Sequence, residues 1–317
     1  MIAKSRLSFL DASKGLFILF VIVAHSPIDF EVFSDNKFLY NLWQLLGTFG
    51  VGGFYIISGY IHGISNKKTY QRISKLLIPW FVSSMFVYFA LSVVNNSIFD
   101  IIGYLQFFIG YQSFYYFLSV LIFFQVFYDF VPVKVRFLLP CISLTSILLT
   151  QLNLIPFMNL IYLNPFNWLV FFWLGNTLKE KDFDFYLNRI SIFMLITLSL
   201  ALLSYCIITN STNYFSIQNV ILQTFVSFLI ISFFKKFKIS KIEDIGKLSF
   251  TIYLWHIPFI SLLNRLMYNQ LLSFQVFKPI LALVFLYALI KVYETITNRF
   301  RNEKSQIFLR TILGLPN

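Results

Sequence analysis

The chain has 317 residues, of which 58% are hydrophobic, 20% aromatic and only 12% charged. Soluble domains carry about 25% charged residues, so a soluble globular protein of this length would lack the polar surface that keeps it in solution. The formal net charge is +12. In a membrane chain the basic residues indicate orientation rather than nucleic-acid binding, so no nucleic-acid partner is expected.

The apolar residues gather in about ten stretches, which predict an all-α polytopic membrane protein with about ten transmembrane helices. In chain order the stretches cover residues 15–33, 38–62, 76–94, 113–131, 136–153, 160–178, 190–209, 217–234, 248–267 and 277–297. They use about 200 residues, which leaves no room for a soluble catalytic domain of ordinary size. We interpret residues 101–112 as an interfacial or re-entrant piece, and residues 1–317 as one integral-membrane domain.

The distribution of Lys and Arg predicts the orientation. Ten spans place both termini on one side of the membrane, together with nearly all of the 25 Lys and Arg residues. Only Lys37, Arg265 and Lys278 fall on the other side, and Lys291 falls within the last span. Because positively charged loops face the cytoplasm, we expect both termini to be cytoplasmic.

Two of the three histidines are expected at the same depth in the membrane. His25 follows Lys14 by 11 residues, which on a regular helix places both side chains on one face, about 16 Å apart. His256 follows Lys247 by nine residues on a span of the same direction. Ionisable groups at mid-bilayer are costly and often functional, so the pair is interpreted as a site with a proton-accepting imidazole. The alternative is that each histidine links neighbouring helices; His62 is interpreted as interfacial.

The second apolar stretch contains glycines at positions 47, 50, 52, 53 and 59. Small residues let helices pack closely, and they can also leave room for part of a ligand; both interpretations stay open. Arg72 and Lys75 follow at the start of the next span, where i, i+3 cations suit phosphate binding as well as cytoplasmic orientation. Cys141 and Cys206 lie in apolar stretches and are expected to be small buried residues, with neither a disulfide nor a metal site.

Three stretches together resemble the acyltransferase 3 family of membrane O-acyltransferases. They are residues 6–25 with Arg6, Asp11, Lys14 and His25; residues 54–60 with Ser58, followed by Arg72-x-x-Lys75; and residues 246–258 with Ser249, Tyr253 and His256. Lysine stands at positions 14 and 75, where the family more commonly has arginine. This keeps the charge but loses the bidentate guanidinium group.

The resemblance implies an inner-membrane enzyme that transfers an acyl group, often acetyl from acetyl-CoA, to a sugar hydroxyl. The acceptor would be a surface polysaccharide, a lipopolysaccharide or another lipid-linked glycan. Acetyl-CoA is then a substrate and no bound cofactor is expected, while the partners are the lipid bilayer, the acyl-CoA and the glycan or glycolipid. Since the chain ends soon after its last span, it is similar to the stand-alone form, without the periplasmic esterase-like domain that many members carry.

The resemblance also implies roles for single residues. His25 would be the general base, and a donor to the developing oxyanion would come from Tyr253, His256 or Ser58. Lys14, Arg72 and Lys75, with Ser58 nearby, would hold the acyl donor, and Arg6 and Asp11 would orient the first helix. A polytopic transporter or flippase for a lipid-linked glycan remains the alternative, because intramembrane histidines and glycine-lined helices suit it equally.

Overall fold

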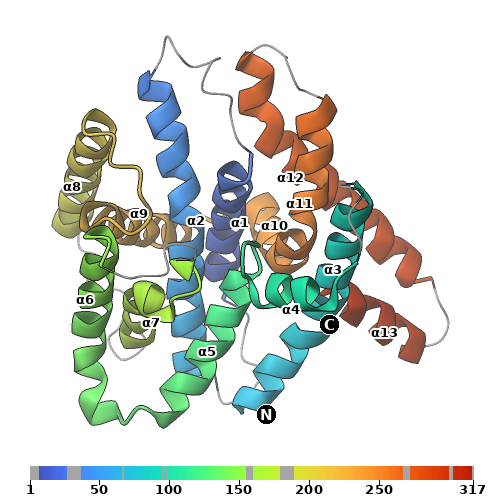
Figure 1. Cartoon of the computed structure of the whole chain (residues 1–317). Coiled ribbons are helices and arrows are strands. Elements are labelled where there is room, and N and C mark those ends of the chain that lie inside the picture. The colour runs from blue at the N-terminus through green and yellow to red at the C-terminus, as the bar shows by residue number, and fades with distance from the viewer. Residues whose placement is uncertain are drawn as a thin grey trace. The chain divides into compact units, whose positions relative to one another are not determined.

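The computed structural model describes residues 7–26, 37–65, 68–94, 96, 99–154, 160–178, 189–266, 272–299 and 303–315, and all regular structure within them is helical. The elements in chain order (Figure 1) are α1 (Ser8–Ala24), α2 (Lys37–Ile64), α3 (Thr69–Val94), α4 (Ile101–Ile109), α5 (Tyr116–Phe130), the 3-10 helix η2 (Val133–Leu138), α6 (Leu139–Gln151), α7 (Pro165–Leu178), α8 (Arg189–Ile208), α9 (Ile217–Lys236), α10 (Ser240–Lys247), α11 (Ser249–Leu266), α12 (Leu272–Thr297) and α13 (Glu303–Leu313).

Each of the ten apolar stretches overlaps one of these helices, namely α1, α2, α3, α5, α6, α7, α8, α9, α11 and α12. Within the described parts of the chain, five segments are long and apolar enough to cross a membrane: 37–64, 69–94, 133–151, 217–236 and 275–297. On α3, Phe86 and Phe89 are 56% and 57% exposed, as expected of a surface that faces lipid rather than water. The chain is therefore an all-helical multi-pass membrane protein, and its crossing by ten helices remains a prediction.

The expected boundaries differ from the observed ones in several places; α3, for instance, begins at Thr69 rather than at residue 76. The first span was expected to reach residue 33, whereas α1 ends at Ala24 and residues 27–33 lie outside the described part. The separate piece expected over 101–112 is α4. Its start is fixed by Asp100, whose carboxylate accepts the Ile102 and Gly103 N–H groups, and its end by Gly110 at φ 101°. The two short helices α10 and α13 were not anticipated.

The chain divides into two compact units. The first comprises residues 1–57, 182–214 and 218–289, and the second comprises residues 58–181, 215–217 and 290–317. The unit boundary falls within α2 and again within α12, so each of these helices contributes to both units.

In the first unit, α10 packs against α1 at two glycines (Figure 1). A Cβ on Gly246 would lie 1.6 Å from the Asp11 carbonyl oxygen, and one on Gly15 would lie 2.3 Å from the Ile242 carbonyl oxygen. Only glycine permits so close an approach. Helix α2 also packs on α1, because a Cβ on Gly50 would lie 2.7 Å from the Val21 side chain. Of the two interpretations of the α2 glycines, close helix packing is the one observed here.

In the second unit, α2 and α7 are also in close contact at a glycine, since a Cβ on Gly59 would lie 2.1 Å from the Phe172 carbonyl oxygen. The interface between α6 and α7 is polar: Asn167, fully buried, accepts hydrogen bonds from Ser146 and Thr150 at 2.7 and 3.2 Å. These bonds satisfy groups that would be costly to leave unpaired in an apolar interior. The α6–α7 pair is therefore held by hydrogen bonds as well as by apolar packing.

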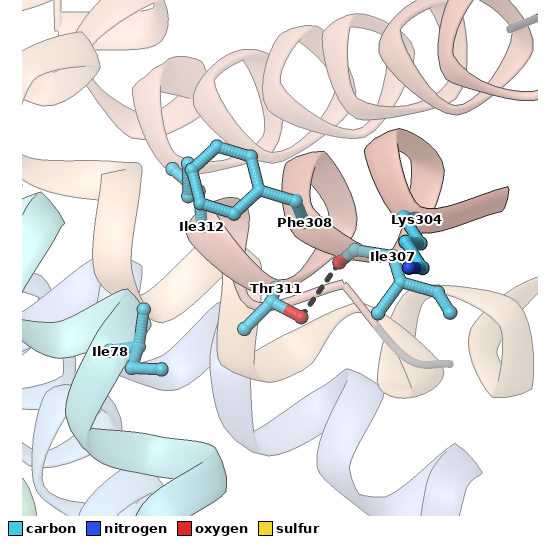
Figure 2. A pocket seen from close by; sticks show the side chains of 6 residues that line it. All are labelled: Ile78, Lys304, Ile307, Phe308, Thr311 and Ile312. Atoms are coloured by element: carbon cyan, nitrogen blue, oxygen red, sulfur yellow. Dashed lines mark hydrogen bonds between the residues drawn. The ribbon is translucent and has the colours of Figure 1, made fainter. Parts of the chain in front are cut away.

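The second unit also contains a hollow of about 330 Å³ between α3 and α13. Figure 2 shows Ile78 of α3 on one side and residues of α13 on the other. The lining consists of Ile78, Lys304, Ile307, Phe308, Thr311 and Ile312. Apart from Lys304 the lining has no ionisable group, and the Thr311 hydroxyl donates to the Ile307 carbonyl. With a single lysine in an otherwise apolar lining, this hollow lacks the set of polar groups that acid–base chemistry needs.

Candidate active site

Two histidines from different helices of the first unit lie side by side. His25 directly follows α1, and its backbone N–H donates to the carbonyls of Val21 and Ile22 at 3.3 and 3.2 Å. Its ring centroid is 5.1 Å from that of His256 on α11, and the two ring planes are inclined by 55°. The two residues expected at equal depth therefore have their rings in direct contact.

The two histidines differ in access and in hydrogen bonding. His256 is fully buried, whereas His25 is partly exposed. The His256 Nδ1 atom lies 2.6 Å from the Tyr253 carbonyl oxygen. A carbonyl only accepts, so Nδ1 carries a proton and Nε2 of the neutral ring is left as an acceptor. His256 is thus oriented by its own helix, and His25 is the less buried residue of the pair.

Two tyrosines lie in the same unit close to this pair. The Tyr253 ring is 5.7 Å from the His256 ring, with an interplanar angle of 33°. Tyr55 on α2 is fully buried and lies close enough to Tyr253 for the two phenols to interact electrostatically. Tyr55 was not singled out from the sequence, although it lies in the 54–60 stretch. Phenolic hydroxyls are suitable donors to an oxyanion, so α2 as well as α11 brings one to this site.

Near the start of α1, Lys14 is paired with Asp11. The Lys14 Nζ atom lies 3.1 Å from Asp11 Oδ1, and the Asp11 side chain is almost completely buried. The regular helix from Ser8 to Ala24 keeps the expected separation of about 16 Å between Lys14 and the residue that follows α1. Part of the Lys14 charge is balanced by Asp11, and Arg6 lies outside the described residues.

Lys247, at the end of α10, has its own acidic partners. Its Nζ atom lies 2.9 Å from Asp244 and 3.0 Å from Glu243. The hydrogen bonds to Asp244 and Glu243 raise the pKa of the Lys247 ammonium above its ordinary value. This lysine therefore stays charged, and two carboxylates of its own helix balance that charge.

The remaining donor-binding candidates belong to the second unit. Ser58 is half-buried on α2, and Lys75 is exposed on α3. Arg72 is half-buried on α3, where its Nη2 atom donates to Thr69 Oγ1 at 2.7 Å. The i, i+3 spacing of Arg72 and Lys75 is realised on a regular helix.

Two predictions about metals and cysteines can be compared with the structure. Among the residues that it describes, no group of three or more His, Cys, Asp or Glu side chains gathers as metal ligands would. Both cysteines are free thiols; Cys206 is buried as expected, but Cys141 is exposed, so the prediction of a buried Cys141 is wrong. Helix α6, which carries Cys141, is largely exposed, and this is why an apolar stretch did not imply burial.

Comparison with known proteins agrees with the motifs. A family described as an acyltransferase domain matches residues 7–291, a range that contains both histidines, both tyrosines and the cations of α3. No curated protein and no solved structure matches the chain. Because the match covers nearly the whole chain, the protein belongs to the acyltransferase 3 family and is a membrane acyltransferase.

Proposed function

We propose that this acyltransferase is an O-acetyltransferase that moves acetyl from acetyl-CoA to a hydroxyl of a cell-surface polysaccharide or a lipid-linked glycan. The observation that carries the proposal is the histidine pair: a partly exposed His25 in ring contact with a buried, oriented His256. Acyl transfer to an alcohol needs a base for the hydroxyl proton, and a neutral imidazole is suited to that task near neutral pH. The membrane in this proposal is a bacterial inner membrane, and the distribution of cations supports a cytoplasmic location of both termini.

In this mechanism the acceptor hydroxyl approaches His25, which removes its proton as the oxygen attacks the thioester carbonyl. The tetrahedral intermediate carries its negative charge on the former carbonyl oxygen, and the phenol of Tyr253 or Tyr55 donates a hydrogen bond to it. Collapse of the intermediate expels the thiolate of coenzyme A, which takes the proton back from His25. The products are an acetyl ester and free coenzyme A, and no covalent bond to the enzyme is formed. His256 holds the His25 ring in place.

The phosphates of the donor are bound by cations at the predicted cytoplasmic ends of helices. Arg72 supplies a planar guanidinium group suited to two phosphate oxygens, and the exposed Lys75 adds a single point charge. Lys14 contributes less than Arg72, because its ammonium is already paired with Asp11. Ser58, half-buried on α2, offers a hydroxyl for the acyl-CoA.

The proposal is tested by NMR of the host's surface polysaccharide, with and without the gene and with a His25→Ala variant. Loss of the O-acetyl signals in both mutants, with unchanged export of the polymer, supports the enzyme. Loss of the polymer itself supports the transporter or flippase instead. If a His25→Ala protein is inserted at the normal level and acetylates at the wild-type rate, His25 is not the base.

A further inference from the structure

The second unit contains a charged cluster that the sequence analysis did not recognise. It combines His62 near the end of α2, Thr69 and Arg72 at the start of α3, Asp129 near the end of α5 and Arg136 on η2. Four elements therefore meet around five polar side chains. Two of the segments involved, 63–75 and 132–136, are predicted to be cytoplasmic from their positive charge.

Asp129 links three of these elements. One of its carboxylate oxygens accepts a hydrogen bond from the Thr69 hydroxyl, and the other lies 3.7 Å from His62 Nε2. Thr69 in turn accepts a hydrogen bond from Arg72 Nη2 at 2.7 Å. The His62 ring is also in edge contact with Phe172. This chain of contacts fixes the directions of both the Arg72 guanidinium and the His62 imidazole.

Arg136 is fixed by the end of α5. Its Nε atom donates to the Val131 carbonyl at 3.1 Å and its Nη2 atom to the Tyr128 carbonyl at 2.9 Å. The guanidinium carbon lies 5.2 Å from the centre of the Tyr128 ring. A cation is favourable at a helix C-terminus, where carbonyl groups lack partners within the helix. Arg136 is thus held by α5 through its Nε and Nη2 groups.

The charges of this cluster do not balance. Both guanidinium groups lie close enough to His62 to interact with it electrostatically, and the carboxylate among them, Asp129, is itself 48% exposed. Arg72 Nε is buried and makes no hydrogen bond with the residues that the structure describes. Two fixed cations, one of them with a buried N–H group that makes no hydrogen bond within the described residues, lie beside one partly solvated anion. An additional anion with several acceptor oxygens would satisfy these donors and cancel the excess charge.

We infer that Arg72, Arg136 and His62 form a binding site for a phosphate group, which is supplied by the nucleotide part of the acyl-CoA donor. Arg72 was expected from the sequence to contact the donor, but Arg136 and His62 are new assignments. Asp129 and Thr69 are positioning residues, because they act by holding His62 and Arg72. The inference rests on the proposed function for the identity of the donor.

Binding of coenzyme A is measured on the purified full-length protein in nanodiscs, by isothermal titration calorimetry. Arg136→Gln is expected to weaken binding by about 10- to 100-fold, the effect of losing hydrogen bonds to a charged group. The matched control is Lys134→Gln, which removes an exposed cation of the same 3-10 helix and is expected to bind as the wild type does. Because Arg136 also caps α5, its replacement can affect folding, and the thermal unfolding midpoint of each variant is therefore recorded. A second variant, His62→Gln, removes no helix cap and is expected to weaken binding of coenzyme A by at least threefold.

The outcomes separate this inference from the proposed function. If the wild type binds no coenzyme A, the proposed donor is wrong and this assignment is wrong with it. If the wild type binds coenzyme A and the folded Arg136→Gln and His62→Gln variants bind it equally well, only this inference is overturned. A third arm compares nanodiscs with and without anionic phospholipid. If the variants lose retained phospholipid but keep full affinity for coenzyme A, the phosphate belongs to a lipid headgroup and the inference is again overturned.

Discussion

Replacing Gly246 by alanine is expected to destabilise the first unit at the crossing of α1 and α10. A Cβ at this position would lie 1.6 Å from the Asp11 carbonyl oxygen and 2.9 Å from the Gly15 nitrogen. Ordinary contact with a Cβ begins at 3.4 Å. Helix α10 would therefore have to move away from α1 by more than about 1.5 Å, because the obstacle is backbone and cannot rotate aside.

Two opposing terms decide the sign of the effect. Alanine is favoured over glycine within a helix by about 1 kcal/mol, so the variant would be more stable than the wild type if a Cβ at position 246 met open space. Overpacking a dense interior costs about 1–3 kcal/mol or more, and a displacement as large as this one belongs at the upper end. We expect a net loss of about 2 kcal/mol. Acyl transfer should fall as well, since Asp11 of α1 holds Lys14 and His25 directly follows α1.

The assay is thermal unfolding of the purified protein in detergent, followed by tryptophan fluorescence. Gly103→Ala on α4 is the control, because its Cβ would meet side-chain atoms rather than backbone, namely the Tyr88 hydroxyl at 2.5 Å and the Asp100 carboxylate at 3.0 Å. We expect Gly103→Ala to unfold close to the wild-type temperature and Gly246→Ala to unfold several degrees below it. If Gly246→Ala unfolds at or above the wild-type temperature with full activity, the reasoning from close backbone contact is refuted.

Three further predictions concern single side chains. If the oxyanion donor is the phenol of Tyr253 or of Tyr55, replacing that tyrosine by phenylalanine should lower kcat by about 10²- to 10³-fold with little change in KM. A wild-type kcat in both variants would exclude the two phenols as oxyanion donors. Lys14→Met should raise the KM for acyl-CoA less than Arg72→Met does, because the Lys14 ammonium is already paired with Asp11. The reverse order would show that this pairing does not weaken the contribution of Lys14. Asp100→Ala should cost about 1 kcal/mol in thermal unfolding, because α4 loses its N-cap, and it should leave kcat unchanged.

The helices were largely predictable from the sequence because of the membrane. A backbone without access to water must satisfy its hydrogen bonds internally, so a long apolar stretch in such a chain becomes a helix. The ten stretches accordingly coincide with ten helices, even where periodicity was uninformative. Helix α10 was missed because residues 235–247 are rich in lysine and were taken only as a positive loop. Its closeness to α1 depends on Gly15 and Gly246, which lie 231 positions apart in the chain.

The candidate site was predictable in part for the same reason. Helical rise and the positive-inside rule were enough to place His25 and His256 at one depth, and the motifs were enough to indicate the family. Depth alone does not show which faces of two helices meet, so the 5.1 Å ring contact required the tertiary structure. The Tyr253 carbonyl that fixes the His256 tautomer and the approach of Tyr55 from α2 likewise depend on packing.

Local composition and spacing along single helices were thus enough to indicate the membrane environment, the helices and the family, and to predict one depth for His25 and His256. Only the tertiary structure decided which side chains meet. It brought Asp129 and Arg136 to His62 and Arg72 from segments about 60 residues apart in the chain. Contacts of this kind depend on how helix faces are turned and how loops fold back, and in helices that are apolar on every side the residue pattern carries no such information.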